Sequence, residues 1–151
     1  MADITLVVGA RTELTTSALN SLGAGTYVSA GVINHTTNNP LDVLTEVAVT
    51  PGTVAGNKQV LVFAKGSLDG TNFSTGPESG TTTTGEPNLV FIGAIPCGTN
   101  ATVQRGVFSL AAAFGGVLPQ QSKIICKNDT GAALASSGHA VHYSEVKGVS
   151  A

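Results

Sequence analysis

Gln59-Val60-Leu61-Val62-Phe63-Ala64 is the stretch of the sequence that most clearly belongs inside a folded domain. Read with the period of two that a strand imposes, it is apolar on both faces, which is typical of a central strand covered on both sides. The segment 65–73 then returns to polar residues, and its Asp69-Gly70 step tolerates positive φ and suits a tight hairpin turn. We therefore predict a buried strand followed by a turn.

The segments on either side of this strand repeat the pattern of short strands and turns. In the segment 41–50, the odd-numbered residues are Leu, Val, Thr, Val and Val, so one side of that strand is expected to face the core. The segment 12–22 is interpreted as strand or irregular structure. Strand 88–95 is expected to be buried on both faces, and strand 102–109 to be bulged at Gly106. Further strands are predicted over 4–8, 26–33, 122–127 and 139–148.

One short helix at most is predicted, near residues 109–115. The segment 110–116 has helical residues and enough length for one turn, and Gly115-Gly116 would cap it. Roughly seven or eight strands spaced by turn signals are typical of a sandwich or jelly roll. The predicted fold class is all-β: a two-sheet β-sandwich or jelly-roll-like domain with an N-terminal arm.

The length of 151 residues fits one domain that can bury a core. Residues 1–10 are predicted to be an N-terminal arm or first strand, and residues 11–151 a single β-sandwich domain. The first strand either belongs to the domain's own sheet or adds to the sheet edge of a neighbouring subunit. The segment 74–87 has no apolar residue to anchor it and is predicted to be a long exposed loop.

The composition is poor in charge. Charged residues make up 11% of the chain, against about 25% in an average globular protein. The formal net charge is −2 and there is no basic run, which argues against nucleic acid as a partner because that affinity comes largely from neutralised phosphates. No secretory signal is predicted. The longest apolar run, 110–118, is about half of what a membrane span needs, so we expect a soluble protein without a membrane partner.

Residues that could carry chemistry are few. Cys97 and Cys126 are predicted to be reduced rather than part of a disulfide framework. His139 and His142 lie three apart on a predicted strand, so they point to opposite faces and cannot jointly hold a metal. The segment 67–73 is faintly similar to turns of sialidase-type repeats, but it is interpreted as a plain hairpin turn.

Motifs for catalysis are equally scarce. Asp42 and Glu46 share one face at a spacing too ordinary for a glycosidase pair. The sequence has neither a nucleophile elbow nor a phosphate loop. We therefore predict a protein that is not an enzyme, with no catalytic residue, no cofactor and no metal.

Four pieces of the chain, in order, resemble small virion structural proteins of tailed bacteriophages. They are Gly-Ser-Leu-Asp-Gly-Thr-Asn-Phe (66–73), Pro-Asn-Leu-Val-Phe-Ile-Gly-Ala-Ile (87–95), Phe-Ser-Leu-Ala-Ala-Ala-Phe-Gly-Gly-Val-Leu-Pro (108–119) and Ile-Ile-Cys-Lys-Asn-Asp-Thr-Gly (124–131). The resemblance covers roughly residues 40–149, and its most specific part is Phe-Gly-Gly-Val-Leu-Pro. It implies a β-sandwich protein that coats or braces a capsid.

The resemblance implies a non-enzymatic capsid decoration (cement) protein that binds and stabilises the lattice of the major capsid protein. Its partners would be that protein and further copies of itself, with a homotrimer expected, because such proteins commonly sit as trimers at threefold positions. It would be found on the capsid exterior of the virion after assembly in the host cytoplasm. The residues expected at its interfaces are Ile4, Thr5, Leu6, Val7, Val8, Phe114 and Leu118.

Two alternatives remain open at this stage. The chain could be a tail, collar or fibre component that contacts host surface glycans through the loop 74–87. It could also be a hydrolase whose carboxylates, or a His-Ser pair, converge in a pocket. The absence of Trp and the presence of only two Tyr favour the structural role, because sugar platforms usually need exposed aromatic rings.

Overall fold

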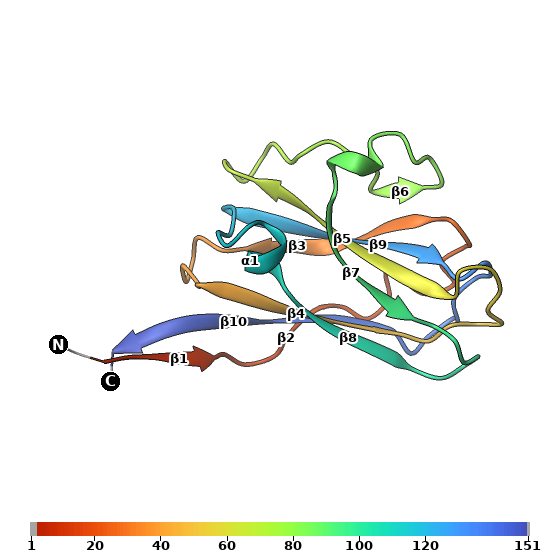
Figure 1. Cartoon of the computed structure of the whole chain (residues 1–151), viewed down its shortest axis with the longest axis horizontal. Coiled ribbons are helices and arrows are strands. Elements are labelled where there is room, and N and C mark those ends of the chain that lie inside the picture. Colours follow the sequence, from red (N-terminus) through yellow and green to blue (C-terminus); the bar gives the residue numbers. More distant parts are fainter. Residues whose placement is uncertain (1–2, 151) are drawn as a thin grey trace.

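The computed structural model describes residues 3–150 as two antiparallel sheets packed face to face (Figure 1). The first sheet has the order β1-β10-β4-β8, and β2 also pairs with β10. Its strands are β1 (Ile4–Val8), β2 (Thr12–Thr15), β4 (Asp42–Val49), β8 (Gln104–Ser109) and β10 (Ala140–Ser150). The all-β sandwich predicted from the sequence is thereby confirmed.

The second sheet has the order β6-β3-β9-β5-β7. The chain passes repeatedly from one sheet to the other, for example between β3 and β4 and between β8 and β9. Among the described residues, no helix is long and apolar enough to cross a membrane. The strands of this sheet are β3 (Tyr27–Asn34), β5 (Gln59–Ser67), β6 (Ser79–Gly80), β7 (Val90–Pro96) and β9 (Gln121–Asp129).

The main core lies between the two sheets. The face of β4 predicted to point inward does so, since Val43, Val47 and Val49 are fully buried. Val60 and Val62 of β5 cover them from the second sheet. Each such side chain contributes roughly 1.5–3 kcal/mol when it leaves water.

β5 is covered on both of its faces, as predicted. On the face turned away from the main core, Phe63 packs with Tyr27, Leu89 and Ile125 in a second, smaller cluster. This cluster lies beneath the segment 74–89, so the second sheet has a core on each side. The turn after β5 is also confirmed, because Gly70 has a φ of +74° and Ser67 pairs with Phe73.

Two predictions about individual strands are wrong. β7 is an edge strand of the second sheet, so it is not buried on both faces, and Phe91 is 55% exposed. β8 has no bulge at Gly106, because its register with β4 runs without interruption. The irregularity falls in β7 instead, where the pairing with β5 shifts between Val62 and Phe63.

The predicted short helix is present as α1 (Leu110–Ala113). The Ser109 hydroxyl accepts a hydrogen bond from the Ala112 amide at 3.0 Å and caps the first turn. Gly115 and Gly116, with φ of +80° and +104°, end the helix as expected, and the Gly116 amide donates to the Ala111 carbonyl at 2.7 Å. A 3-10 turn, η1 (Glu86–Asn88), lies in the segment before β7.

The two cysteines are free, as predicted, and the structure places both in the main core. Burial raises the pKa of the Cys126 thiol to about 12 and also raises that of Cys97. Both thiols are therefore protonated and shielded at neutral pH.

Candidate functional site

The end of the molecule that carries both termini is a two-stranded ribbon that projects from the sandwich (Figure 1). β10 pairs with β4 only as far as Val146, which lies opposite Asp42. Beyond that point β10 pairs with β1 alone, from Val8 opposite Val146 to Ile4 opposite Ser150. We call residues 4–8 with 146–150 the arm ribbon. β1 is thus a strand of the chain's own sheet and at the same time an arm.

The arm ribbon exposes apolar side chains on both faces. Ile4, Leu6 and Val8 share one face, and Ile4 and Leu6 are 75% and 65% exposed. Val7 points to the other face, where Val149 is also exposed. Isolated exposed apolar residues are ordinary, but a contiguous set on a projecting element marks an interaction site.

β1 also leaves one backbone edge free. Within residues 3–150, β1 pairs with β10 and with no other strand. The Gly9 amide donates to the Glu145 carbonyl at 2.8 Å, and hydrogen-bonding residues alternate along an antiparallel strand. Thr5 and Val7 therefore point their backbone groups toward β10, and those of Ile4, Leu6 and Val8 point away from the sheet.

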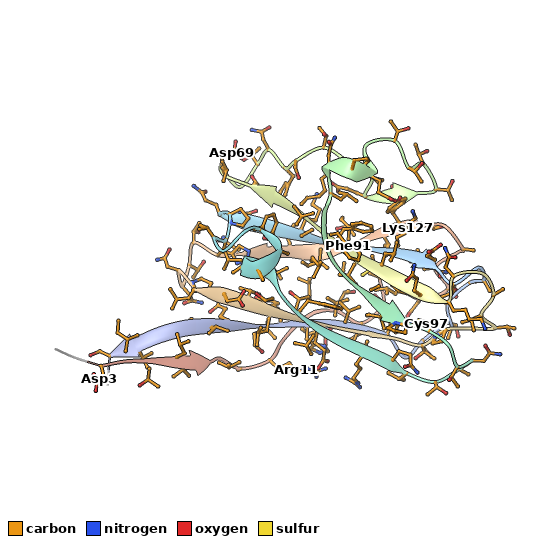
Figure 2. All side chains as sticks on the ribbon, in the orientation of Figure 1. Asp3, Arg11, Asp69, Phe91, Cys97 and Lys127 are labelled. Carbon is orange, nitrogen blue, oxygen red and sulfur yellow. The ribbon has the colours of Figure 1, made fainter. Side chains whose placement is uncertain are left out.

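A charged cluster on the outer face of the first sheet holds the segment that joins β1 to β2. Glu46 accepts hydrogen bonds from Arg11 and, at 3.1 Å, from Arg105, and His142 Nδ1 lies 4.0 Å away. The hydrogen bond from Arg11 is the main reason why the pKa of Glu46 lies below its usual value. Figure 2 shows Asp3 near the tip of the arm and Arg11 beyond the other end of β1, beside the body of the sandwich. This cluster ties the segment between β1 and β2 to β4 and β8.

A second brace comes from the loop that joins β3 and β4. The Asn38 side-chain amide donates to both carboxylate oxygens of Glu145, at 3.1 and 2.9 Å, and Lys147 pairs with the same carboxylate at 2.8 Å. Burial opposes ionisation of Glu145, but the hydrogen bonds from Lys147 and Asn38 outweigh it and hold its pKa below the usual value. The arm ribbon is therefore held in place where it leaves the sheet by these side-chain contacts.

The other two predicted interface residues are placed differently. Phe114 and Leu118 are half-buried and pack against the main core. Phe114 lies against Gly66, where an added Cβ would come within 3.1 Å of its ring, and Leu118 lines a cavity of about 220 Å³ beside His35. The exposed apolar residue of that loop is Val117, at 76%.

Two exposed apolar residues that were not predicted as interface residues, Val149 and Leu41, lie on or beside the arm ribbon. The prediction ended the last strand at Gly148, whereas β10 continues to Ser150 and exposes Val149. The apolar alternation breaks at Glu145 and Lys147, so no local signal in the sequence indicated this extension. Leu41, at the start of β4, is also exposed and would touch a Cβ added at Gly148.

The segment 74–89, which we call the strap, lies across the outer face of the second sheet. Most of its residues are exposed, as predicted, but charged side chains hold it down. Glu78 accepts from Lys65 and from Lys123 at 2.7 Å each, and Glu86 accepts from Lys127 at 2.6 Å. Burial opposes ionisation of Glu78, but the two lysines outweigh it and lower its pKa.

The strap encloses a shallow hollow of about 420 Å³. Its polar lining is Thr75, Ser79, Thr82, Thr84 and Asn88. No aromatic ring lines this hollow, so it lacks the stacking surface that sugars commonly use.

Two of the residues considered for chemistry, His139 and Asp42, have structural partners. His139 Nδ1 accepts from the Thr50 amide at 3.2 Å, so its Nε2 donates to the Ala135 carbonyl at 2.9 Å. Asp42 accepts from the Val43 and Ala111 amides at 2.7 and 2.8 Å, which ties α1 to β4.

The turn at Asp69 is likewise self-contained. Backbone hydrogen bonds from Asn72 and Thr71 lower the pKa of Asp69, and the Ser67 hydroxyl also donates to it, at 2.9 Å. Within residues 3–150, no three His, Cys, Asp or Glu side chains are grouped to hold a metal ion.

No protein-family model matches the chain. No curated protein matches it either. The function must therefore be inferred from the geometry and from the resemblance described above.

Proposed function

We propose that this protein is a non-enzymatic structural component of a tailed-phage virion, a decoration (cement) protein that binds the lattice of the major capsid protein. The observation that carries the proposal is the arm ribbon, which projects from a braced base and whose strand β1 is uncharged and apolar. The chain resembles small virion proteins in four ordered pieces, and its β-sandwich fold fits that role.

The physical basis of binding is burial of the arm. Each Å² of apolar surface removed from water contributes about 25 cal/mol, and the exposed side chains of Ile4, Leu6 and Val8 supply such surface. Because β1 carries no charge, a partner can cover it without the cost of desolvating an unpaired ion. On a lattice, many weak contacts of this kind add up through multivalency.

The proposed partners are the major capsid protein and further copies of this chain, as a homotrimer on the capsid exterior. The weakly charged sandwich surface supports close packing of copies, since few charges would have to be buried. No nucleic-acid partner, membrane partner or cofactor forms part of the proposal.

Removal of residues 2–9 tests the proposal directly. We expect the truncated protein to stay folded, because all five residues of β1 are exposed, and to lose binding to undecorated capsids in a co-sedimentation assay. Leu6→Asp should weaken binding at least tenfold, because it places a charge in the contact. Leu68→Asp is the matched control, since Leu68 is also largely exposed (79%, against 65% for Leu6) but lies on the turn after β5.

This assay decides whether the arm docks the protein on the capsid. If the folded truncation binds capsids as tightly as the intact chain, the arm is not the docking element. If the intact chain binds no undecorated capsid, and cryo-EM density places the protein elsewhere in the particle, the decoration role itself is excluded.

The alternative is a tail, collar or fibre component that contacts host glycans. The hydroxyl-lined hollow of the strap is the observation that favours it. Binding to a glycan array that is abolished by Asn88→Ala, with no binding to capsids, would favour this alternative over decoration.

A further inference from the structure

The free edge of β1 has the features of a sheet edge that can accept another strand. Exposed edge strands are usually protected by charges, prolines, bulges or shortness, because unpaired N–H and C=O groups invite another strand. Ile4-Thr5-Leu6-Val7-Val8 has no charge and no proline, and its register with β10 is uninterrupted. The backbone groups of Ile4, Leu6 and Val8 therefore point to an edge that is open and unprotected.

We propose that this edge pairs with the same edge of a second copy of the chain, antiparallel and centred on Leu6. A twofold axis at Leu6 sets Leu6 against Leu6 of the second copy and Ile4 against Val8. These are the residues whose backbone groups point outward, so each pair can exchange both of its hydrogen bonds. A centre on Thr5 or Val7 would place inward-pointing backbone groups at the axis and would leave the edge with fewer paired residues.

The side chains favour a second copy as the occupant. In this register, every pair joins apolar or hydroxyl side chains: Leu6 with Leu6, Ile4 with Val8 and Thr5 with Val7. No like charges meet across the strands, a contact that would be destabilising. The nearest charge on the ribbon, Lys147, is already paired with Glu145 at 2.8 Å. The strand is thus complementary to itself on both faces.

The contact is small, with five residues from each copy, so we expect a weak dimer that forms at high protein concentration. The pairing itself does not depend on the proposed function. It does add a consequence to it: pairing and capsid docking would compete for one edge. The free protein would then keep its arm covered until a capsid strand or surface replaces the second copy.

A charge exchange at the axis tests the pairing. In sedimentation equilibrium at millimolar concentration, the intact chain should contain dimer, whereas Leu6→Lys and Leu6→Glu should each be monomeric, because each would set like charges against each other. An equimolar mixture of the two variants should restore the dimer. A monomeric intact chain, or a mixture that stays monomeric, would overturn the proposal.

A cysteine scan tests the register. Cα atoms of directly paired residues lie about 5.5 Å apart, within the range that a disulfide bridges. Leu6→Cys should therefore form a covalent dimer under mild oxidation. Ile4→Cys is the control, since two copies of residue 4 would be four residues out of register and about 13 Å apart. Equal yields from the two variants would overturn the register.

Failure of this inference is distinguishable from failure of the proposed function. A chain that is monomeric at all concentrations but binds capsids through its arm would overturn the pairing alone. A chain that dimerises as described but binds capsids equally well without residues 2–9 would overturn the docking role of the arm alone. If both hold, the oxidised Leu6→Cys dimer should not bind capsids until it is reduced.

Discussion

The side chain of Phe108 closes the sandwich at one of its edges. Its ring lies over Gly106 on its own strand and against Gly93 on β7, so it fills the space between the edge strands of the two sheets. A Cβ added at Gly106 would come within 2.6 Å of this ring. The sequence predicts a bulge at Gly106, but in the structure this glycine makes room for an aromatic ring.

We predict that Gly106→Ala destabilises the protein by about 1–3 kcal/mol, because the ring must leave its position to admit the methyl group. Gly98→Ala is the control, since an added Cβ there meets nothing within 4 Å. Urea unfolding of both variants measures the difference. Equal midpoints for the two would show that the ring can move without cost.

At the scale of elements, the strap shows how a segment with few apolar residues is kept in place. Lys65 is 5% exposed, and a lysine so buried requires a partner. Glu78 provides it and also pairs with Lys123, while Leu89 enters the second cluster beside Phe63. Two carboxylates and one leucine thus fasten the strap over that cluster.

We predict that Glu78→Gln destabilises the protein by about 1–3 kcal/mol at neutral pH, because it leaves Lys65 without its counter-ion. The pKa of Glu78 is lowered by folding, so its contribution is present above the usual value of 4.5 and is lost as the pH falls below it. The difference in unfolding free energy between the two proteins should therefore shrink as the pH drops below 4.5.

Glu13→Gln is the matched control for the strap, since Glu13 is exposed on β2. At each pH in the same range, the unfolding free energy of this variant should be nearly equal to that of the unmodified protein. A Glu78→Gln variant that behaves like Glu13→Gln would mean that the ion pairs do not hold the strap.

At the scale of the whole molecule, the sequence predicts the strands better than their partners. The pattern of apolar residues is a local signal: alternation identifies the inward face of β4, and an unbroken apolar run identifies the two covered faces of β5. No local signal joins Ile4 to Ser150, or Glu78 to Lys123. The sequence thus predicts the strand 4–8 but not the ribbon that it forms with the last strand.

The packing of the two sheets also shields the two thiols from solvent and from reagents. Cys97 and Cys126 lie in the main core, and burial raises the pKa of both. We expect neither to react with a thiol reagent at mildly alkaline pH in the native state, and both to react at once in denaturant. The Leu6→Cys variant should show one fast native thiol, because residue 6 is exposed. Fast labelling of the unmodified chain at native conditions would mean that the sheets separate readily, and that the arm does not project from a rigid body.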